Sequence, residues 1–212
     1  MLDARLRRVV DPPLDRIGTI LAARGVRPDY VTAAGFLVGT VAWVALAFQA
    51  YGAALGLILA NRILDGLDGA VARRGAPTDA GGFLDIVCDF VFYSGVAFFF
   101  AVGRPEAALP AAFLVFSFVG TGSSFLAYAV FAAKRGLDTS IRGRKSLYYI
   151  GGLTEGTETI ALFVLICLLP DWFAWFAWGF GALCWLTTGV RTAAGLSAFR
   201  AQPPPRNADQ SP

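Results

Sequence analysis

The sequence predicts an all-α integral membrane protein with six transmembrane helices and an amphipathic helix at the N-terminus. Of its 212 residues, 56% are hydrophobic and only 16% are charged. A helix of about 20 apolar residues crosses the hydrocarbon core of a bilayer, and several stretches of the chain have that character. We expect spans at roughly 31–50, 52–72, 82–102, 108–133, 154–170 and 172–196.

The segment before the first span predicts a short helix lying on the membrane surface, over about residues 12–24. Asp11 is suited to cap its start, with prolines at the first helical positions. Apolar residues then follow at helical spacing, namely Leu14, Ile17 and Leu21. The alternative is a positively charged flank that only sets the orientation of the first span.

Most of the 18 Lys and Arg residues lie before the first span, after the second, between the fourth and fifth, and in the tail. The positive-inside rule therefore places both termini on the cytoplasmic side. We expect one membrane domain over 1–200, a disordered tail over 201–212, and residence in a bacterial inner (cell) membrane. With this charge distribution the basic pI of 8.9 indicates membrane topology and not a nucleic-acid partner.

Three isolated cysteines and the absence of His predict neither a zinc site nor a disulfide framework.

Two pairs of aspartates lie at the ends of the second and third spans. Asp65 and Asp68 are three residues apart, and Asp85 and Asp89 are four apart, so each pair shares a helix face. Because the connecting loop is short, we expect the two helices to be antiparallel neighbours and the four carboxylates to converge. Such acids are costly near a membrane unless cations balance them. Carboxylate oxygens suit Mg²⁺ or Mn²⁺, and two such ions would balance four carboxylates.

The surroundings of the acids favour a diphosphate ligand. Small residues allow a ligand to approach the backbone, and Arg73 follows directly with a planar donor group that suits phosphate. Arg62, one turn before Asp65, either pairs with that acid or extends its charge to the membrane surface. Glu155 and Glu158 share a face at the start of the fifth span. They are either functional acids or residues that suit a helix N-terminus.

The pattern Asp65-x2-Asp68-Gly69-x2-Ala72-Arg73, followed by Gly81-x3-Asp85-x3-Asp89, resembles the signature of the CDP-alcohol phosphotransferases. The resemblance covers most of the chain. One departure is the loop of seven residues between Arg73 and Gly81, which is one residue shorter than is usual in the family and bears on the contacts to cytidine.

The resemblance implies an enzyme that transfers a phosphatidyl-type group from a CDP-linked lipid, such as CDP-diacylglycerol, to an alcohol and releases CMP. It implies a metal site at Asp65, Asp68, Asp85 and Asp89, with Asp89 also the general base. It further implies a homodimer, and contacts to the CDP group from Gly69, Ala72, Arg73, Thr78 and Gly81. A phosphate-bearing or polyol acceptor is favoured, and the candidate acceptor residues are Arg135, Arg142, Arg144, Lys145, Glu155 and Glu158.

A rival hypothesis is a divalent-cation or proton-coupled transporter, because intramembrane acids also line transport pathways. The acids gather at one face of the predicted bundle only, and the opposite half offers no matching series of polar residues. The enzyme therefore remains the favoured interpretation.

Overall fold

A computed structural model of the chain describes residues 2–75, 78–135, 154 and 156–201, and these residues form helices joined by short connections. The helices are α1 (Leu2–Ala23), α2 (Pro28–Ala47), α3 (Tyr51–Ala72), α4 (Asp79–Gly103), α5 (Ala108–Lys134), α6 (Gly156–Leu168) and α7 (Phe173–Ala201). Two short 3₁₀ helices, η1 (Pro105–Ala107) and η4 (Pro170–Trp172), precede α5 and α7. The prediction of an all-helical chain is confirmed.

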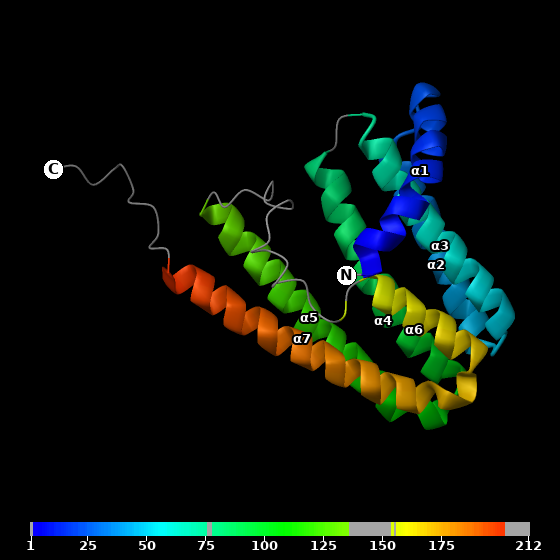
Figure 1. The fold of residues 1–212 in the computed structure, drawn as a ribbon. Coiled ribbons are helices and arrows are strands. Elements are labelled where there is room, and N and C mark those ends of the chain that lie inside the picture. Colours follow the sequence, from blue (N-terminus) through cyan, green and yellow to red (C-terminus); the bar gives the residue numbers. More distant parts are fainter. Residues whose placement is uncertain (1, 76–77, 136–153, 155, 202–212) are drawn as a thin grey trace.

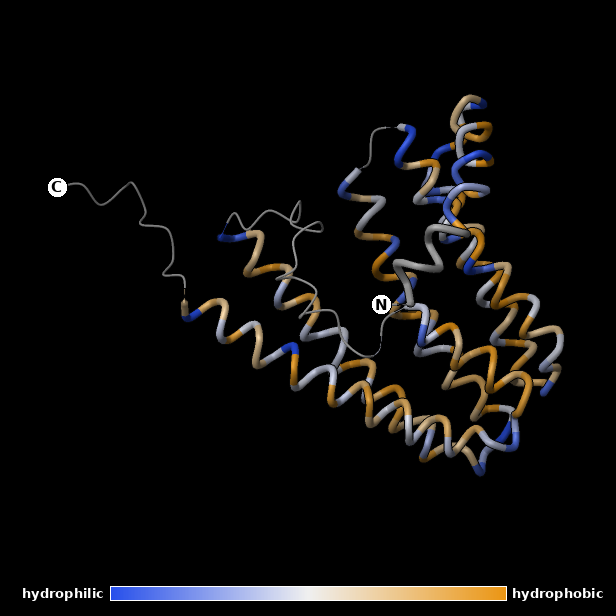
Figure 2. The backbone as a smooth tube through the Cα atoms, viewed as in Figure 1, coloured by the Kyte–Doolittle hydropathy of each residue, from blue (hydrophilic) through white to orange (hydrophobic). Residues whose placement is uncertain are grey.

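Four of these helical segments are long and apolar enough to cross a membrane: Pro28–Ala47, Asp79–Gly103, Pro105–Lys134 and Pro170–Ala201. Along the helices, hydrophobic residues dominate, and hydrophilic residues gather near the helix ends (Figure 2). α3 has the length of a span at 22 residues, but its second half carries Arg62, Asp65 and Asp68. α6 is apolar and has 13 residues. Spans at α3 and α6 therefore stay predictions.

The start of α1 was predicted wrongly. The helix begins at Leu2, and Pro12 and Pro13 lie inside it, so Asp11 is not its N-cap. A proline inside a helix removes a backbone hydrogen bond and bends the axis without always ending the helix, and Figure 1 shows α1 bending along its length. The end was predicted correctly, because Gly25 follows with a φ of 76°, a conformation in which glycine commonly ends helices.

The helices form two groups. α2 packs against α3 and α4, α1 lies on α3, and α6 contacts α3, whereas α5 and α7 run side by side and reach away from the others (Figure 1). α4 also packs against α5 and so joins the groups. One hydrophobic core runs through both groups, and its fully buried side chains include Leu46, Ile58, Phe92, Phe100, Leu114 and Phe163.

Close packing of α2 depends on small residues, since Gly35 and Gly39 are both buried on this helix. In lipid, helices associate through van der Waals contact and hydrogen bonds, because the lipid is as apolar as the side chains. A Cβ added at Gly39 would lie 2.7 Å from Phe92 Cδ2 and 3.1 Å from Asn61 Nδ2. Glycine at this position lets α2 approach α3 and α4 together.

Candidate active site

The end of α3 and the start of α4 lie at one end of the molecule (Figure 1), and the aspartates lie on the adjoining turns of both helices. α4 starts here because Thr78 caps it, its hydroxyl oxygen accepting a 3.0 Å hydrogen bond from the Gly81 amide. The cap fixes the first turns of α4, which carry Asp85 and Asp89.

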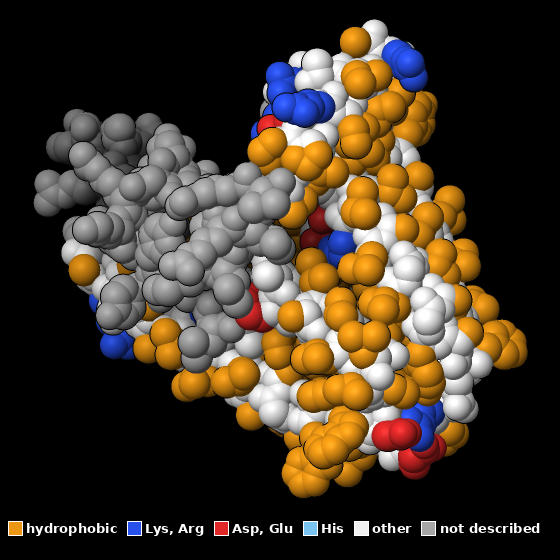
Figure 3. Space-filling model, turned by 45° about the vertical axis from the view of Figure 1, so that its right-hand side comes forward, with side chains coloured by type: hydrophobic (Ala, Val, Ile, Leu, Met, Phe, Trp, Pro, Cys, Tyr) orange, Lys and Arg blue, Asp and Glu red, His pale blue; other side chains and the backbone are white. Residues whose placement is uncertain are grey.

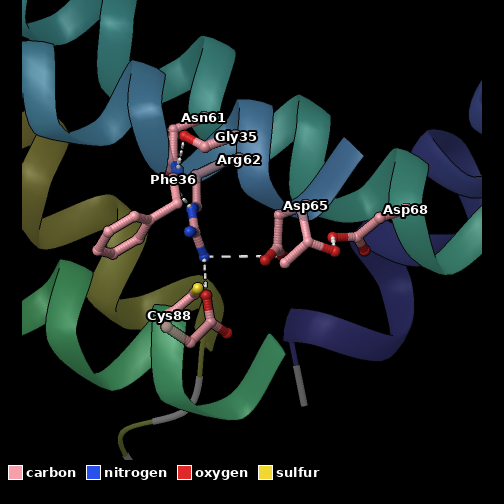
Figure 4. A pocket seen from close by; sticks show the side chains of 9 residues that line it. Gly35, Phe36, Asn61, Arg62, Asp65, Asp68 and Cys88 are labelled. Atoms are coloured by element: carbon pink, nitrogen blue, oxygen red, sulfur yellow. Dashed lines mark hydrogen bonds and ion pairs between the residues drawn. The ribbon is translucent and has the colours of Figure 1, made fainter. Parts of the chain in front are cut away.

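Three of the four aspartates form a cluster. One carboxylate oxygen from each of Asp65, Asp68 and Asp85 lies within 4.8 Å of the other two. Figure 4 shows Asp65 and Asp68 on successive turns of α3, with their carboxylates close together. The prediction that two neighbouring helices bring their acids together is confirmed for these three.

Asp68 is the most enclosed of the three, with 6% of its surface exposed. The Thr32 hydroxyl of α2 donates a 2.7 Å hydrogen bond to Asp68 Oδ2. A hydrogen bond to one oxygen fixes the carboxylate and leaves its other oxygen available to a cation. Partners of this kind orient metal ligands in many proteins.

Asp89 lies beside this cluster and pairs with Arg62 of α3. Arg62 NH1 donates to Asp89 Oδ1 at 2.8 Å and lies 3.7 Å from Asp65 Oδ2. Of the two alternatives for Arg62, pairing is therefore confirmed, and Asp89 is its nearer partner. Figure 4 shows Arg62 between Asn61 and Asp65.

A small cavity of about 10 Å³ opens between these side chains. It is bounded by Thr32, Gly35, Phe36, Asn61, Arg62, Asp65, Asp68, Cys88 and Asp89. A space of about 10–15 Å³ holds one water molecule. The cavity is therefore large enough for one water molecule or one ion, and a nucleotide has to lie outside it. Figure 3 shows acidic and basic side chains at the base of a hollow in a largely apolar surface.

The donor set fits a divalent cation. Three carboxylates from two helices converge within reach of one ion, and hard oxygen ligands are those that Mg²⁺ and Mn²⁺ prefer. Arg62, with 9% of its side chain exposed, supplies only one positive charge against the four acids.

The residues expected at the CDP group line the same end of the molecule. Gly69 and Ala72 lie on the last turn of α3, followed by Arg73, and Thr78 and Gly81 form the start of α4. The Arg73 guanidinium is half exposed and pairs with Asp15 of α1 at 2.9 Å. A surface pair of this kind is weak, so Arg73 is easily available to a phosphate.

Two of the expected acceptor residues lie in the described chain, and neither borders the small cavity between the aspartates. Arg135 follows α5, and its NH1 donates to the Phe199 carbonyl at 2.7 Å. Glu158, on the first turn of α6, borders a groove of about 370 Å³ between α6 and α7. The other four, Arg142, Arg144, Lys145 and Glu155, lie outside the described residues.

Sequence reasoning missed Thr32 and Asn61, which support the site from α2 and α3. It also gave no role to Arg191, a buried arginine of α7 whose NH1 donates to the Thr121 carbonyl at 3.0 Å. A charge inside an apolar run is by itself a signal of function, so Arg191 could have been selected. Thr32 gave no such signal, because its partner is 36 residues away.

Together these features define an integral membrane protein that gathers carboxylates at the end of a helix pair. A family model described as CDP-alcohol phosphatidyltransferase matches residues 25–188. The chain belongs to this family of enzymes, which transfer phosphatidyl groups from CDP-linked lipids.

The chain is also similar to individual proteins. The chain is 56% identical over 201 residues to the inner membrane protein YnjF of Escherichia coli (strain K12), covering 94% of this chain and 98% of that protein. It is 39% identical over 102 residues to archaetidylinositol phosphate synthase of Pyrococcus horikoshii, covering 47% of this chain and 54% of that protein.

A solved structure has the same fold. The crystal structure of Mycobacterium tuberculosis phosphatidylinositol phosphate synthase (PgsA1) with CDP-DAG bound matches with a TM-score of 0.63 at 20% identity. The match covers 94% of this chain and 98% of that one.

Proposed function

We propose that this protein catalyses the metal-dependent transfer of a phosphatidyl group from CDP-diacylglycerol to an alcohol, with release of CMP. The observation that carries the proposal is the three-aspartate cluster of Asp65, Asp68 and Asp85, which lies in the region matched by the family model. The CDP-DAG bound to the structural neighbour supports the choice of donor.

Asp65, Asp68 and Asp85 would hold Mg²⁺ or Mn²⁺, with Asp89 as a further candidate ligand. The ion would supply charge neutralisation at the diphosphate and stabilise the departing CMP. Arg73 would leave Asp15 and bind a phosphate oxygen. Gly69, Ala72, Thr78 and Gly81 would border the nucleotide.

In the transfer step, the acceptor oxygen forms a bond to the phosphorus of the phosphatidyl group. The bond from that phosphorus to the CMP oxygen breaks, and CMP leaves with the electron pair. Asp89 takes the proton of the acceptor hydroxyl, as a general base in reach of the reacting group would.

For the acceptor, we propose a phosphate-bearing polyol. The relatives named as archaetidylinositol phosphate synthases support this choice. Arg135, Arg142, Arg144 and Lys145 remain the candidates for binding the acceptor phosphate, and Glu155 and Glu158 for its hydroxyl groups.

The proposed topology has six spans, with α3 and α6 completing the four apolar helices. The aspartate cluster and both termini would face the cytoplasm, and α1 would lie on the inner membrane surface. The distribution of Lys and Arg supports this orientation, and the Escherichia coli relative supports a bacterial inner membrane. A homodimer is part of the same proposal.

The test is a screen of alcohols with purified protein and labelled CDP-diacylglycerol, reading CMP release and the lipid product. We expect Mg²⁺- or Mn²⁺-dependent product with a phosphorylated polyol. The Asp89→Asn variant should bind Mn²⁺ and remain folded, while its CMP release should fall to a small residual rate that long incubation still measures. Cation uptake into sealed vesicles without nucleotide, in a protein that releases no CMP, would support the transporter instead.

A further inference from the structure

Arg62 is a buried charge in the half of α3 that carries the acids. Only 9% of its side chain is exposed, and a charge in this position is costly unless it is well paired. Its guanidinium is a rigid planar group with five N–H donors, and the contacts around it account for several of them.

The Arg62 guanidinium contacts both polar side chains and aromatic rings. Its Nε donates to Asn61 Oδ1 at 2.7 Å, and its NH1 donates to Asp89 Oδ1 at 2.8 Å and to the Tyr93 hydroxyl at 3.1 Å. The guanidinium carbon lies 4.7 Å from the Phe92 ring centre and 5.2 Å from that of Tyr93, distances at which cations and aromatic rings attract each other.

The group that holds Arg62 is itself fixed. Asn61 Nδ2 donates a 2.8 Å hydrogen bond to the Gly35 carbonyl of α2, and Asn61 is 3% exposed. A chain of hydrogen bonds therefore runs from α2 through α3 to Asp89 on α4. The orientation of Asp89 is set by three helices at once.

Arg62 interacts unequally with the two aspartates nearest to it. At 2.8 Å its NH1 makes a charge-assisted hydrogen bond to Asp89, whereas the 3.7 Å separation from Asp65 is too long for one. Asp65 stays in the cluster with Asp68 and Asp85. The ion pair uses Oδ1 of Asp89 and does not itself occupy Oδ2.

We propose that Arg62 is a positioning residue that holds Asp89 in one orientation beside the metal cluster, so that three aspartates serve the metal and Asp89 serves the acceptor hydroxyl. The inference rests on the proposed function, because it takes Asp89 as the proton acceptor. A fixed carboxylate is pre-oriented for the reacting group, and loss of such orientation slows catalysis without weakening binding.

A structural role for Arg62 gives a different expectation. If Arg62 only joined α3 to α4, its loss would lower stability, donor binding, metal binding and turnover together. A positioning role lowers turnover selectively and acts only through Asp89.

The experiment is a double-mutant cycle in the full-length protein in nanodiscs, with Arg62→Gln, Asp89→Asn and the combination. Steady-state CMP release gives kcat and KM for CDP-diacylglycerol, and Mn²⁺ binding without nucleotide is followed by electron paramagnetic resonance. Arg62→Lys tests rescue, because it keeps the charge but loses the planar donor group. Arg104→Gln is the matched control, since Arg104 makes ion pairs with Glu106 and Asp171 beyond the far end of α4.

We expect Arg62→Gln to lower kcat about 10- to 100-fold, the range found for groups that orient other active residues. KM for the donor and the Mn²⁺ dissociation constant should change less than about threefold, which is roughly the margin within which the effects of independent sites add. Arg62→Lys should recover part of kcat, and Arg104→Gln should keep it. When Asp89→Asn is already present, adding Arg62→Gln should not lower kcat any further.

Several results would overturn the inference. One is an equal loss of kcat from Arg62→Gln with and without Asp89, and another is a loss of Mn²⁺ affinity as large as the loss of kcat. An Arg62→Gln variant with normal kcat would overturn it while leaving the proposed function in place. A wild-type protein that binds Mn²⁺ but releases no CMP would instead reject the proposed function, and the inference with it.

Discussion

Replacing Thr32 by Val should weaken divalent-ion binding while leaving the helices intact. The change removes the hydroxyl that donates to Asp68 Oδ2 at 2.7 Å, and Thr32 and Asp68 are 8% and 6% exposed. A hydrogen bond to a charged group contributes about 1.5–3 kcal/mol. Because about 1.4 kcal/mol corresponds to a factor of ten, the Mn²⁺ dissociation constant should rise about 10- to 100-fold.

The assay is Mn²⁺ titration of the full-length protein, followed by electron paramagnetic resonance, with thermal unfolding measured in parallel. Thr32→Ser keeps a hydroxyl and should retain most of the affinity. Thr40→Val is the matched control, because the Thr40 hydroxyl donates to the Leu37 carbonyl within the same helix. Unchanged Mn²⁺ affinity in Thr32→Val would refute the argument that α2 orients a metal ligand.

Asp85→Asn should reduce Mn²⁺ affinity about 100-fold or more, since loss of a ligand exceeds the effect of losing its supporting group; Asp79→Asn, at an exposed acid of the same helix, should leave the affinity unchanged, and equal affinities of the two variants would contradict the cluster. Chelation with EDTA should stop CMP release, and Mg²⁺ or Mn²⁺ should restore it; turnover that persists in EDTA would exclude a metal requirement. Gly39→Ala places a Cβ 2.7 Å from Phe92 Cδ2 and should cost about 1–3 kcal/mol of stability. Thermal unfolding tests this, with Gly56→Ala as the control because a Cβ there meets nothing within 4 Å; a normal melting temperature in Gly39→Ala would show that α2 can shift.

The residues that could be predicted from the sequence are those whose spacing along one helix determines their position. Asp65 and Asp68 must share a face at a separation of three, and the short loop brings Asp85 beside them. The apolar length of each run likewise predicted where helices lie, and α5 agrees with the expected span to within one residue at its end.

Contacts between helices were harder to predict because the spans are apolar on every side. An apolar pattern then does not reveal how each helix is rotated about its axis. The pairing of Arg62 with Asp89 and of Thr32 with Asp68 depends on that rotation. The predicted start of α1 was wrong for another reason. A pair of prolines is compatible both with the first turn of a helix and with a bend inside one, and the local sequence does not distinguish the two.

The packing of α1 gives the N-terminal segment an importance that the family match alone does not suggest. The matched region begins at residue 25, so α1 lies wholly outside it. Yet a Cβ at Gly18 would lie 2.8 Å from Ala70 Cβ, and Leu14 is buried against the same part of α3. A shortened protein that kept only the matched region would lose the helix that packs against the second half of α3, where Asp65 and Asp68 lie. N-terminal deletions or fusions should therefore be designed as changes to the candidate active site.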